Sequence, residues 1–219
     1  MKAIQIVGRK KSGKTGLTVR LIPLLQRAGL RVGTVKHSSH PHPLDREGSD
    51  SWLHRKAGAE ATLGITAVAG TLHFDLPKDE EAVEELIGRF LGDLDLVLIE
   101  GWSQRKGAKI EVLPADKEGK LREPRHLESG ELIAVVLGPG VKADENALEG
   151  WGLRLQRKGA SANAGAHAGA DAGSELSSAR GRADEGSEAS KGQREAIPAY
   201  MWEDCAGVAE IILSWFAAG

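Results

Sequence analysis

Short apolar runs alternate with longer segments of helical periodicity along the first two thirds of the chain. The runs at 3–7, 31–35, 61–66, 95–99, 109–113 and 132–137 have the length and composition of strands. An acidic start followed by an apolar stripe predicts a helix over 78–91, and shorter helical patterns occupy 17–25, 51–56 and 208–216. This alternation predicts an α/β fold with a mostly parallel sheet and helices on both faces.

A glycine-rich loop lies between the first apolar run and the first helical pattern. Its residues are Gly8, Arg9, Lys10, Lys11, Ser12, Gly13, Lys14 and Thr15, which match G-x-x-x-x-G-K-[ST] at every fixed position. In such a loop, backbone N–H groups and the positive end of the following helix surround phosphate oxygens. We expect Lys14 to reach the terminal phosphates and the Thr15 hydroxyl to bind Mg²⁺. The motif in this context predicts a P-loop NTPase three-layer sandwich that binds a nucleotide.

A P-loop protein also needs a carboxylate at the end of a neighbouring strand to hold Mg²⁺. Glu100 directly follows the apolar run 95–99 and is placed for that role, although a solvent-facing acid at a strand end shows the same pattern. Asp45 is a second candidate, with only a loop around it. Thr15, Glu100 and Asp45 are therefore the candidate metal ligands.

The segment 156–195 differs from the rest of the chain in composition. It consists mostly of Ala, Gly, Ser and charged residues, and glycines interrupt its alanine runs. Such a segment buries too little apolar surface to offset its ordering entropy. We interpret it as a low-complexity disordered insertion. Residues 1–155 then form a P-loop nucleotide-binding domain, and 196–219 supply a C-terminal helix that completes the same domain.

Charge and cysteine content narrow the possible partners and location. The net charge of -2 gives no electrostatic case for nucleic acid or an anionic membrane as a partner. Cys205 is the only cysteine, which excludes an intrachain disulfide and a Cys-based zinc cage. The chain shows no signal-peptide pattern and no apolar run of membrane-spanning length, so we expect a cytoplasmic protein.

An ordered series of motifs makes the sequence similar to the molybdopterin-guanine dinucleotide biosynthesis adaptor (MobB) family. After the P-loop come Val35-Lys36-His37 with His40, then Asp45, Gly48-Ser49-Asp50-Ser51, Ala57-Gly58-Ala59-Glu60-Ala61, Asp95-Leu96-Val97-Leu98-Ile99-Glu100-Gly101 and Lys109-Ile110-Glu111-Val112. The Lys-His and Ala-Gly-Ala-Glu blocks are more specific than the P-loop, which many families share. The resemblance covers residues 2–140 and resumes near Ile197.

The resemblance implies a GTP-binding protein, usually a homodimer, with weak GTPase activity. It would assist attachment of GMP to molybdopterin in molybdenum cofactor biosynthesis, while a separate guanylyltransferase performs the transfer. Lys14, Glu100, His37 and Asp45 are then the candidate catalytic residues, with Lys36 on phosphate or on the pterin. The sequence departs from the family at Gly16, where a second threonine is common, and at 138–140, where an acid is usual.

Base selection has little support from the residues themselves. Guanine is normally chosen by the Asp of an [NT]-K-x-D loop after a late strand. Residues 141–144 keep Lys142 and Asp144 but lack the first polar position and come a few residues late. A surface loop is the preferred interpretation, so GTP rather than ATP rests on the resemblance.

Three histidines crowd the loop after the second apolar run. His37, His40 and His42 lie near Asp45, a mixture able to bind zinc or nickel. The loop follows a strand at the edge where α/β proteins bind ligands, which favours contact of His37 with phosphate or substrate. Trp102 is able to stack on a ring, although packing is the commoner role of an aromatic beside a core strand.

Three functions are compatible with these features. The first is a slow GTPase coupled to cofactor assembly, and the second is an adaptor in which bound nucleotide only organises a partner interface. The third is a small-molecule kinase or another ATP-dependent protein. A kinase needs a mobile lid with arginines over the phosphates, and Arg105 and Lys106 are too few for one.

Overall fold

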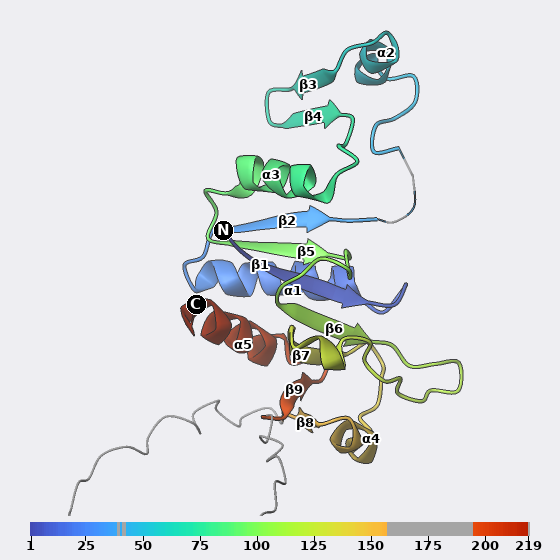
Figure 1. Cartoon of the computed structure of the whole chain (residues 1–219), viewed down its shortest axis with the longest axis vertical. Coiled ribbons are helices and arrows are strands. Elements are labelled where there is room, and N and C mark those ends of the chain that lie inside the picture. The colour runs from blue at the N-terminus through green and yellow to red at the C-terminus, as the bar shows by residue number, and fades with distance from the viewer. Residues whose placement is uncertain (39, 41–42, 157–194, 219) are drawn as a thin grey trace, which may run out of the picture.

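The computed structural model describes residues 1–38, 40, 43–156 and 195–218. Seven strands form one sheet in the order β2-β5-β1-β6-β7-β9-β8, and every neighbouring pair in it is parallel. Their bounds are β1 Lys2–Gly8, β2 Val32–Lys36, β5 Leu96–Glu100, β6 Lys109–Leu113, β7 Leu132–Leu137, β8 Leu153–Leu155 and β9 Ile197–Tyr200. The predicted parallel sheet is confirmed (Figure 1).

Helices cover both faces of this sheet. The helices are α1 Lys14–Arg27, α2 Asp50–Lys56, α3 Glu80–Leu91, α4 Glu145–Gly150 and α5 Cys205–Ala218, with a 3-10 turn at Leu127–Ser129. Side chains alternate along each strand, so Leu96 and Leu98 pack towards α1 and α5, while Val97 and Ile99 pack towards α3. A third cluster packs β7 against α4. The three layers follow from this alternation.

The long connection from β2 to β5 carries a separate substructure, which we call the hairpin lobe (residues 43–76). It contains α2 and an antiparallel pair, β3 Ala61–Ile65 and β4 Gly70–Phe74. The lobe extends beyond α3, away from the main sheet (Figure 1). Its apolar side chains are largely exposed: Ile65 is 76% and Val68 is 95% exposed. The lobe therefore has little core of its own.

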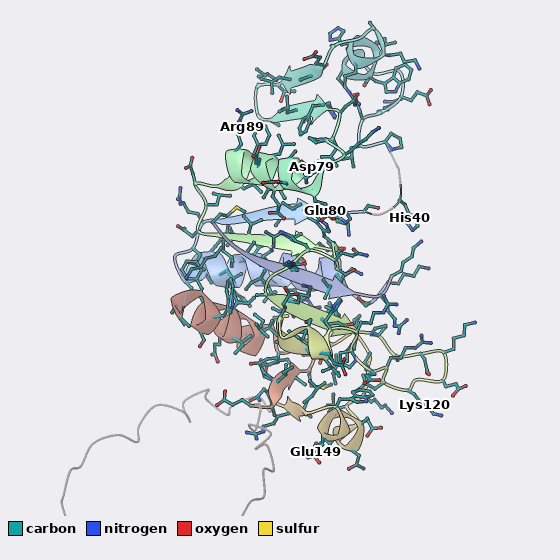
Figure 2. All side chains as sticks on the ribbon, viewed as in Figure 1. His40, Asp79, Glu80, Arg89, Lys120 and Glu149 are labelled. Atoms are coloured by element: carbon teal, nitrogen blue, oxygen red, sulfur yellow. The ribbon has the colours of Figure 1, made fainter. Side chains whose placement is uncertain are left out.

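Helix α3 returns the chain from the lobe to β5 and has the expected charge pattern. Asp79 caps its first turn by accepting hydrogen bonds from the backbone N–H groups of Glu81 and Ala82. Asp79 and Glu80 lie at one end of the helix and Arg89 at the other (Figure 2). Acids at the N-terminus and a base in the last turn both interact favourably with the helix dipole.

The structure also contains elements that the sequence pattern did not reveal. These are the strands β4, β8 and β9 and the helix α4. Strand β9 lies between β7 and β8, so the segment after residue 195 adds a strand to the sheet as well as a helix. The predicted insertion 156–195 falls outside the described residues except at its two ends. Within the described part of the chain, no helix has the length and apolarity needed to cross a membrane.

Candidate functional site: a phosphate-binding cleft

The P-loop connects the end of β1 to the start of α1 in a tight curve. Gly8 and Gly13 have φ values of 140° and 106°, and Lys11 also has a positive φ of 62°. A Cβ added to Gly8 would lie 2.4 Å from the carbonyl oxygen of Val112 on β6. The loop therefore requires glycine at its first position for both conformation and space.

The N-terminus of α1 differs from those of the next three helices. Helices α2, α3 and α4 have side-chain caps from Ser49, Asp79 and Asp144, respectively. Helix α1 begins after Gly13, with no side-chain cap and no acidic residue in its first turn. Its first backbone N–H groups and its positive dipole end are therefore left for an anion, as the mechanism of a phosphate site requires.

The Lys14 side chain is hydrogen-bonded to the backbone at the start of the P-loop, next to the proposed phosphate site. Its Nζ donates to the carbonyl oxygens of Gly8 at 3.1 Å and Arg9 at 2.7 Å. Burial lowers the pKa of Lys14 below its usual value, Glu100 opposes that shift, and Lys36 adds to it. A bound anion at this point would favour the charged form of Lys14.

Glu100 joins two other candidate residues at one oxygen atom. Strand β5 lies between β2 and β1, which places Glu100 beside Lys36 in register. The Oε1 atom of Glu100 accepts a hydrogen bond from Thr15 Oγ1 at 2.8 Å and another from Lys36 Nζ. The carboxylate side chain is only 9% exposed. The structure thus brings Thr15 and Glu100, two of the candidate metal ligands, within hydrogen-bond distance of each other.

These groups line a cleft of about 370 Å³, formed by residues 10–16 with Lys36 and Glu100. Its lysines suit a polyphosphate, and its hydroxyl and carboxylate oxygens are the donors that Mg²⁺ prefers. Ser12 Oγ is buried and has no hydrogen-bond partner among the described residues. The donor set therefore fits a magnesium-bound nucleotide phosphate, with Thr15 and Glu100 as the residues that would hold the metal.

Trp202, which the sequence analysis did not single out, packs against the P-loop. It follows β9 and is only 8% exposed. A Cβ added to Gly13 would lie 2.9 Å from its Cη2 atom, and one added to Gly16 would lie 3.1 Å from its Cζ2 atom. Glycine at position 16 therefore has a steric explanation in this chain, since a threonine there would press on the indole.

The loop after β7 also contacts the P-loop. A Cβ added to Gly138 would lie 2.7 Å from the carbonyl oxygen of Ser12, and the Pro139 ring approaches Gly13 as closely as Trp202 does. Further along, Asp144 caps α4 by accepting a hydrogen bond from the Ala147 N–H at 3.1 Å. This cap gives Asp144 a structural role in agreement with the surface-loop interpretation.

His37 and Trp102 lie on the segments that leave the two strand ends. Their rings are stacked, with centroids 5.0 Å apart and planes within 12°. The backbone N–H of His37 also donates to the backbone carbonyl oxygen of Glu100 at 2.9 Å. Trp102 is buried, with a positive φ of 52°, so it has the packing role that its position favoured.

Asp45 lies in the hairpin lobe, outside the lining of the cleft. Its Oδ1 accepts hydrogen bonds from Ser49 and Ser51 at 3.0 and 3.1 Å and lies 4.0 Å from His73 Nε2. Burial alone would raise the pKa of Asp45, but the two hydroxyls and His73 outweigh burial and lower it. The structure thus brings together Lys14, Thr15, Lys36 and Glu100 and leaves Asp45 with the lobe.

The histidine loop is described only in part. His40 lies on the segment that leads from β2 to the lobe (Figure 2), and His42 is outside the described residues. Among the residues that the structure describes, no three His, Cys, Asp or Glu side chains gather in a metal-binding arrangement. A metal bound by His37, His40 and His42 together stays a prediction, because His42 lies outside the described residues.

Comparison with known proteins shows which family the chain resembles. The model of the family "Molybdopterin guanine dinucleotide synthesis protein B" matches residues 3–138. The chain is 37% identical to the molybdopterin-guanine dinucleotide biosynthesis adapter protein of Escherichia coli K12 over 110 residues, 49% of this chain and 62% of that protein. It is also 37% identical to the protein of that name from Haemophilus influenzae over 106 residues, 48% of this chain and 59% of that protein. The matches thus span about 60% of the length of these relatives.

A solved structure agrees in fold over nearly the whole chain. The crystal structure of Bacillus subtilis MobB superposes with a TM-score of 0.56 at 20% identity, covering 98% of this chain and 97% of the other. At that identity the superposition shows a shared fold only, and membership of the family rests on the sequence match. Because the family model spans more than half of the chain and includes the P-loop, Lys36 and Glu100, the chain belongs to the family of molybdopterin guanine dinucleotide synthesis protein B.

Proposed function

We propose that this protein binds GTP with Mg²⁺ at the P-loop cleft and acts as an adaptor in molybdenum cofactor biosynthesis. In this role it assists attachment of GMP to molybdopterin, which a separate guanylyltransferase carries out. The observation that carries the proposal is the hydrogen bond between Thr15 Oγ1 and Glu100 Oε1 at the mouth of an uncapped helix. The family relationship supplies the pathway.

The cleft favours binding over rapid hydrolysis. Among the described residues that line it, Glu100 is the one carboxylate and none is a histidine. The Glu100 oxygen is already engaged by Thr15 and Lys36, and the His37 ring is held against Trp102. A hydrolase needs a group that orients the attacking water, which this lining does not provide beyond Glu100. We therefore infer a slow GTPase whose bound nucleotide organises an interface.

The test is a calorimetric titration of the purified protein with GTP and with ATP, each with Mg²⁺. A preference for GTP that the Lys14→Ala variant loses would support the proposal. A guanylyltransferase pull-down with and without GTP would then test the adaptor role. Equal binding of the two nucleotides, or a preference for ATP, would refute the guanine assignment and favour a kinase or another ATP-dependent function.

We also propose that the protein is a homodimer that uses the hairpin lobe as part of its interface. Leu63, Ile65 and Val68 on and beside β3 are 62%, 76% and 95% exposed, which is an unusual cluster for a lobe with so small a core. Light scattering on the parent and on Ile65→Asp tests this proposal, and Val19→Asp on α1 is a control of similar exposure. A monomeric parent, or equal effects of the two variants, would refute it.

A further inference from the structure

Two side chains donate to one carboxylate oxygen in this cleft. Thr15 Oγ1 and Lys36 Nζ both donate to Oε1 of Glu100, and that oxygen is also the one placed to hold Mg²⁺ beside the Thr15 hydroxyl. The Lys36 side chain is 61% exposed, whereas the Glu100 side chain is 9% exposed. The carboxylate is therefore the fixed partner, and the lysine reaches it from the solvent side.

We propose that Lys36 is a tethered cation that occupies Glu100 in the metal-free site and that Mg²⁺ must displace it. This inference rests on the proposed magnesium–nucleotide function of the same cleft. It assigns Lys36 a role in setting metal affinity, in addition to any contact with phosphate.

The chemistry of the two cations makes their binding at Oε1 of Glu100 competitive. Mg²⁺ coordinates oxygen at about 2.0–2.1 Å and demands near-octahedral geometry. An ammonium on the same carboxylate oxygen occupies part of the space and lone-pair density that the metal needs, and its positive charge repels the ion. Since Lys36 is largely exposed, its ammonium is free to leave towards solvent without disturbing packing.

The backbone at Lys36 stays anchored when the side chain moves. Lys36 pairs with Glu100 in the β2–β5 register, and the next residue, His37, donates its N–H to the Glu100 carbonyl oxygen. Lys36 lines the cleft together with Lys10 and Lys11, so a displaced ammonium would move to the solvent side of the same cleft, beside the place of a bound anion. Metal binding thus converts Lys36 from a carboxylate partner into a phosphate partner without unfolding β2.

The test is a titration of the protein with Mn²⁺, a magnetic probe for Mg²⁺ sites, followed by electron paramagnetic resonance. It is done without nucleotide and with a slowly hydrolysed GTP analogue. Lys36→Met should bind Mn²⁺ about fivefold more tightly than the parent, which is the factor expected for an ion pair with one exposed partner. Lys36→Arg keeps the pairing and should restore the parental affinity.

A matched control removes a charge from the same cleft without touching Glu100. Lys11→Met should weaken nucleotide binding and leave the Mn²⁺ affinity of the nucleotide-free protein within twofold of the parent. Lys36→Met should tighten Mn²⁺ binding while it weakens the affinity for the nucleotide. Opposite signs for metal and nucleotide distinguish a displaced cation from a simple phosphate ligand.

The outcomes separate this inference from the proposed function. If Lys36→Met binds Mn²⁺ no more tightly than the parent, the inference is overturned even where GTP binds well. If the parent binds no nucleotide, the proposed function fails, and the nucleotide-free titration still decides the competition at Glu100. If neither parent nor variant binds Mn²⁺, both ideas fall.

Discussion

Shortening Trp202 to phenylalanine should loosen the P-loop while leaving the sheet intact. The atoms of Trp202 that face Gly13 and Gly16 are Cζ2, Cζ3 and Cη2, on the outer edge of the indole. A phenylalanine ring ends short of that edge. The substitution Trp202→Phe therefore keeps an aromatic side chain after β9 but removes its contact with the first turn of α1.

The size of the effect follows from the atoms removed. Phenylalanine has three fewer side-chain heavy atoms, and each buried carbon group is worth about 0.8 kcal/mol, so unfolding should become easier by about 2 kcal/mol. A loosened loop must be ordered again when the nucleotide binds. If half of that free energy is needed to order the loop on binding, GTP affinity falls by about five- to tenfold, because each 1.4 kcal/mol changes the dissociation constant tenfold.

The assays are urea unfolding and GTP calorimetry on the parent, Trp202→Phe and Trp215→Phe. Trp215 lies on α5, where it is partly buried against the same core and lines a cleft with Met1 and Arg105. The control should lose stability without losing GTP affinity. If Trp202→Phe and Trp215→Phe bind GTP equally well, Trp202 is only a core residue and the proposed support of the P-loop is wrong.

Three further changes test other parts of the structure. Gly13→Ala should abolish nucleotide binding, since its Cβ would meet Pro139 at 2.8 Å at a φ of 106°; calorimetry measures this, and near-parental binding would contradict it. Burial lowers the pKa of Lys14 below its usual value, so GTP affinity should fall as the pH rises through that pKa, because the triphosphate favours the charged amine; a flat profile through the alkaline range would count against that role. Asp45→Asn should lower the stability of the protein above pH 3.8 and match the parent in stronger acid. The reason is that the fold favours the ionised Asp45, whose pKa it lowers, so this stabilisation is lost once acid protonates the carboxylate; a pH-independent gap in unfolding midpoint would refute this.

The sequence predicted the site where local pattern and chain order were sufficient. The P-loop motif placed Gly8 and Lys14, and the run 95–99 placed Glu100 at a strand end. Both strands are buried and parallel, so their ends meet at one edge of the sheet, which brings Glu100 to Thr15. Lys36 joins them because β2 lies on the other side of β5.

What the sequence did not reveal depends on contacts between distant segments. Strands β8 and β9 have three and four residues, and Pro198 lies in β9, so neither carries a periodic signal of its own. Trp202 contacts a loop that lies far earlier in the chain, and no spacing rule links the two. Asp45 has the residue type of a metal ligand, but only the fold shows that its partners are Ser49 and Ser51.

The topology connects the proposed interface to the cleft. The hairpin lobe is inserted in the connection between β2 and β5, the two neighbouring strands that end in Lys36 and Glu100. The chain leaves for the lobe through His37, whose ring is stacked on Trp102 just after Glu100. Along the chain, this stacked pair stands next to the lysine that shares Oε1 of Glu100 with Thr15. If Lys36 competes with the metal and the lobe forms the interface, as proposed, the residue that leads to the interface directly follows the competing lysine, so the two sites would be coupled over a single peptide bond.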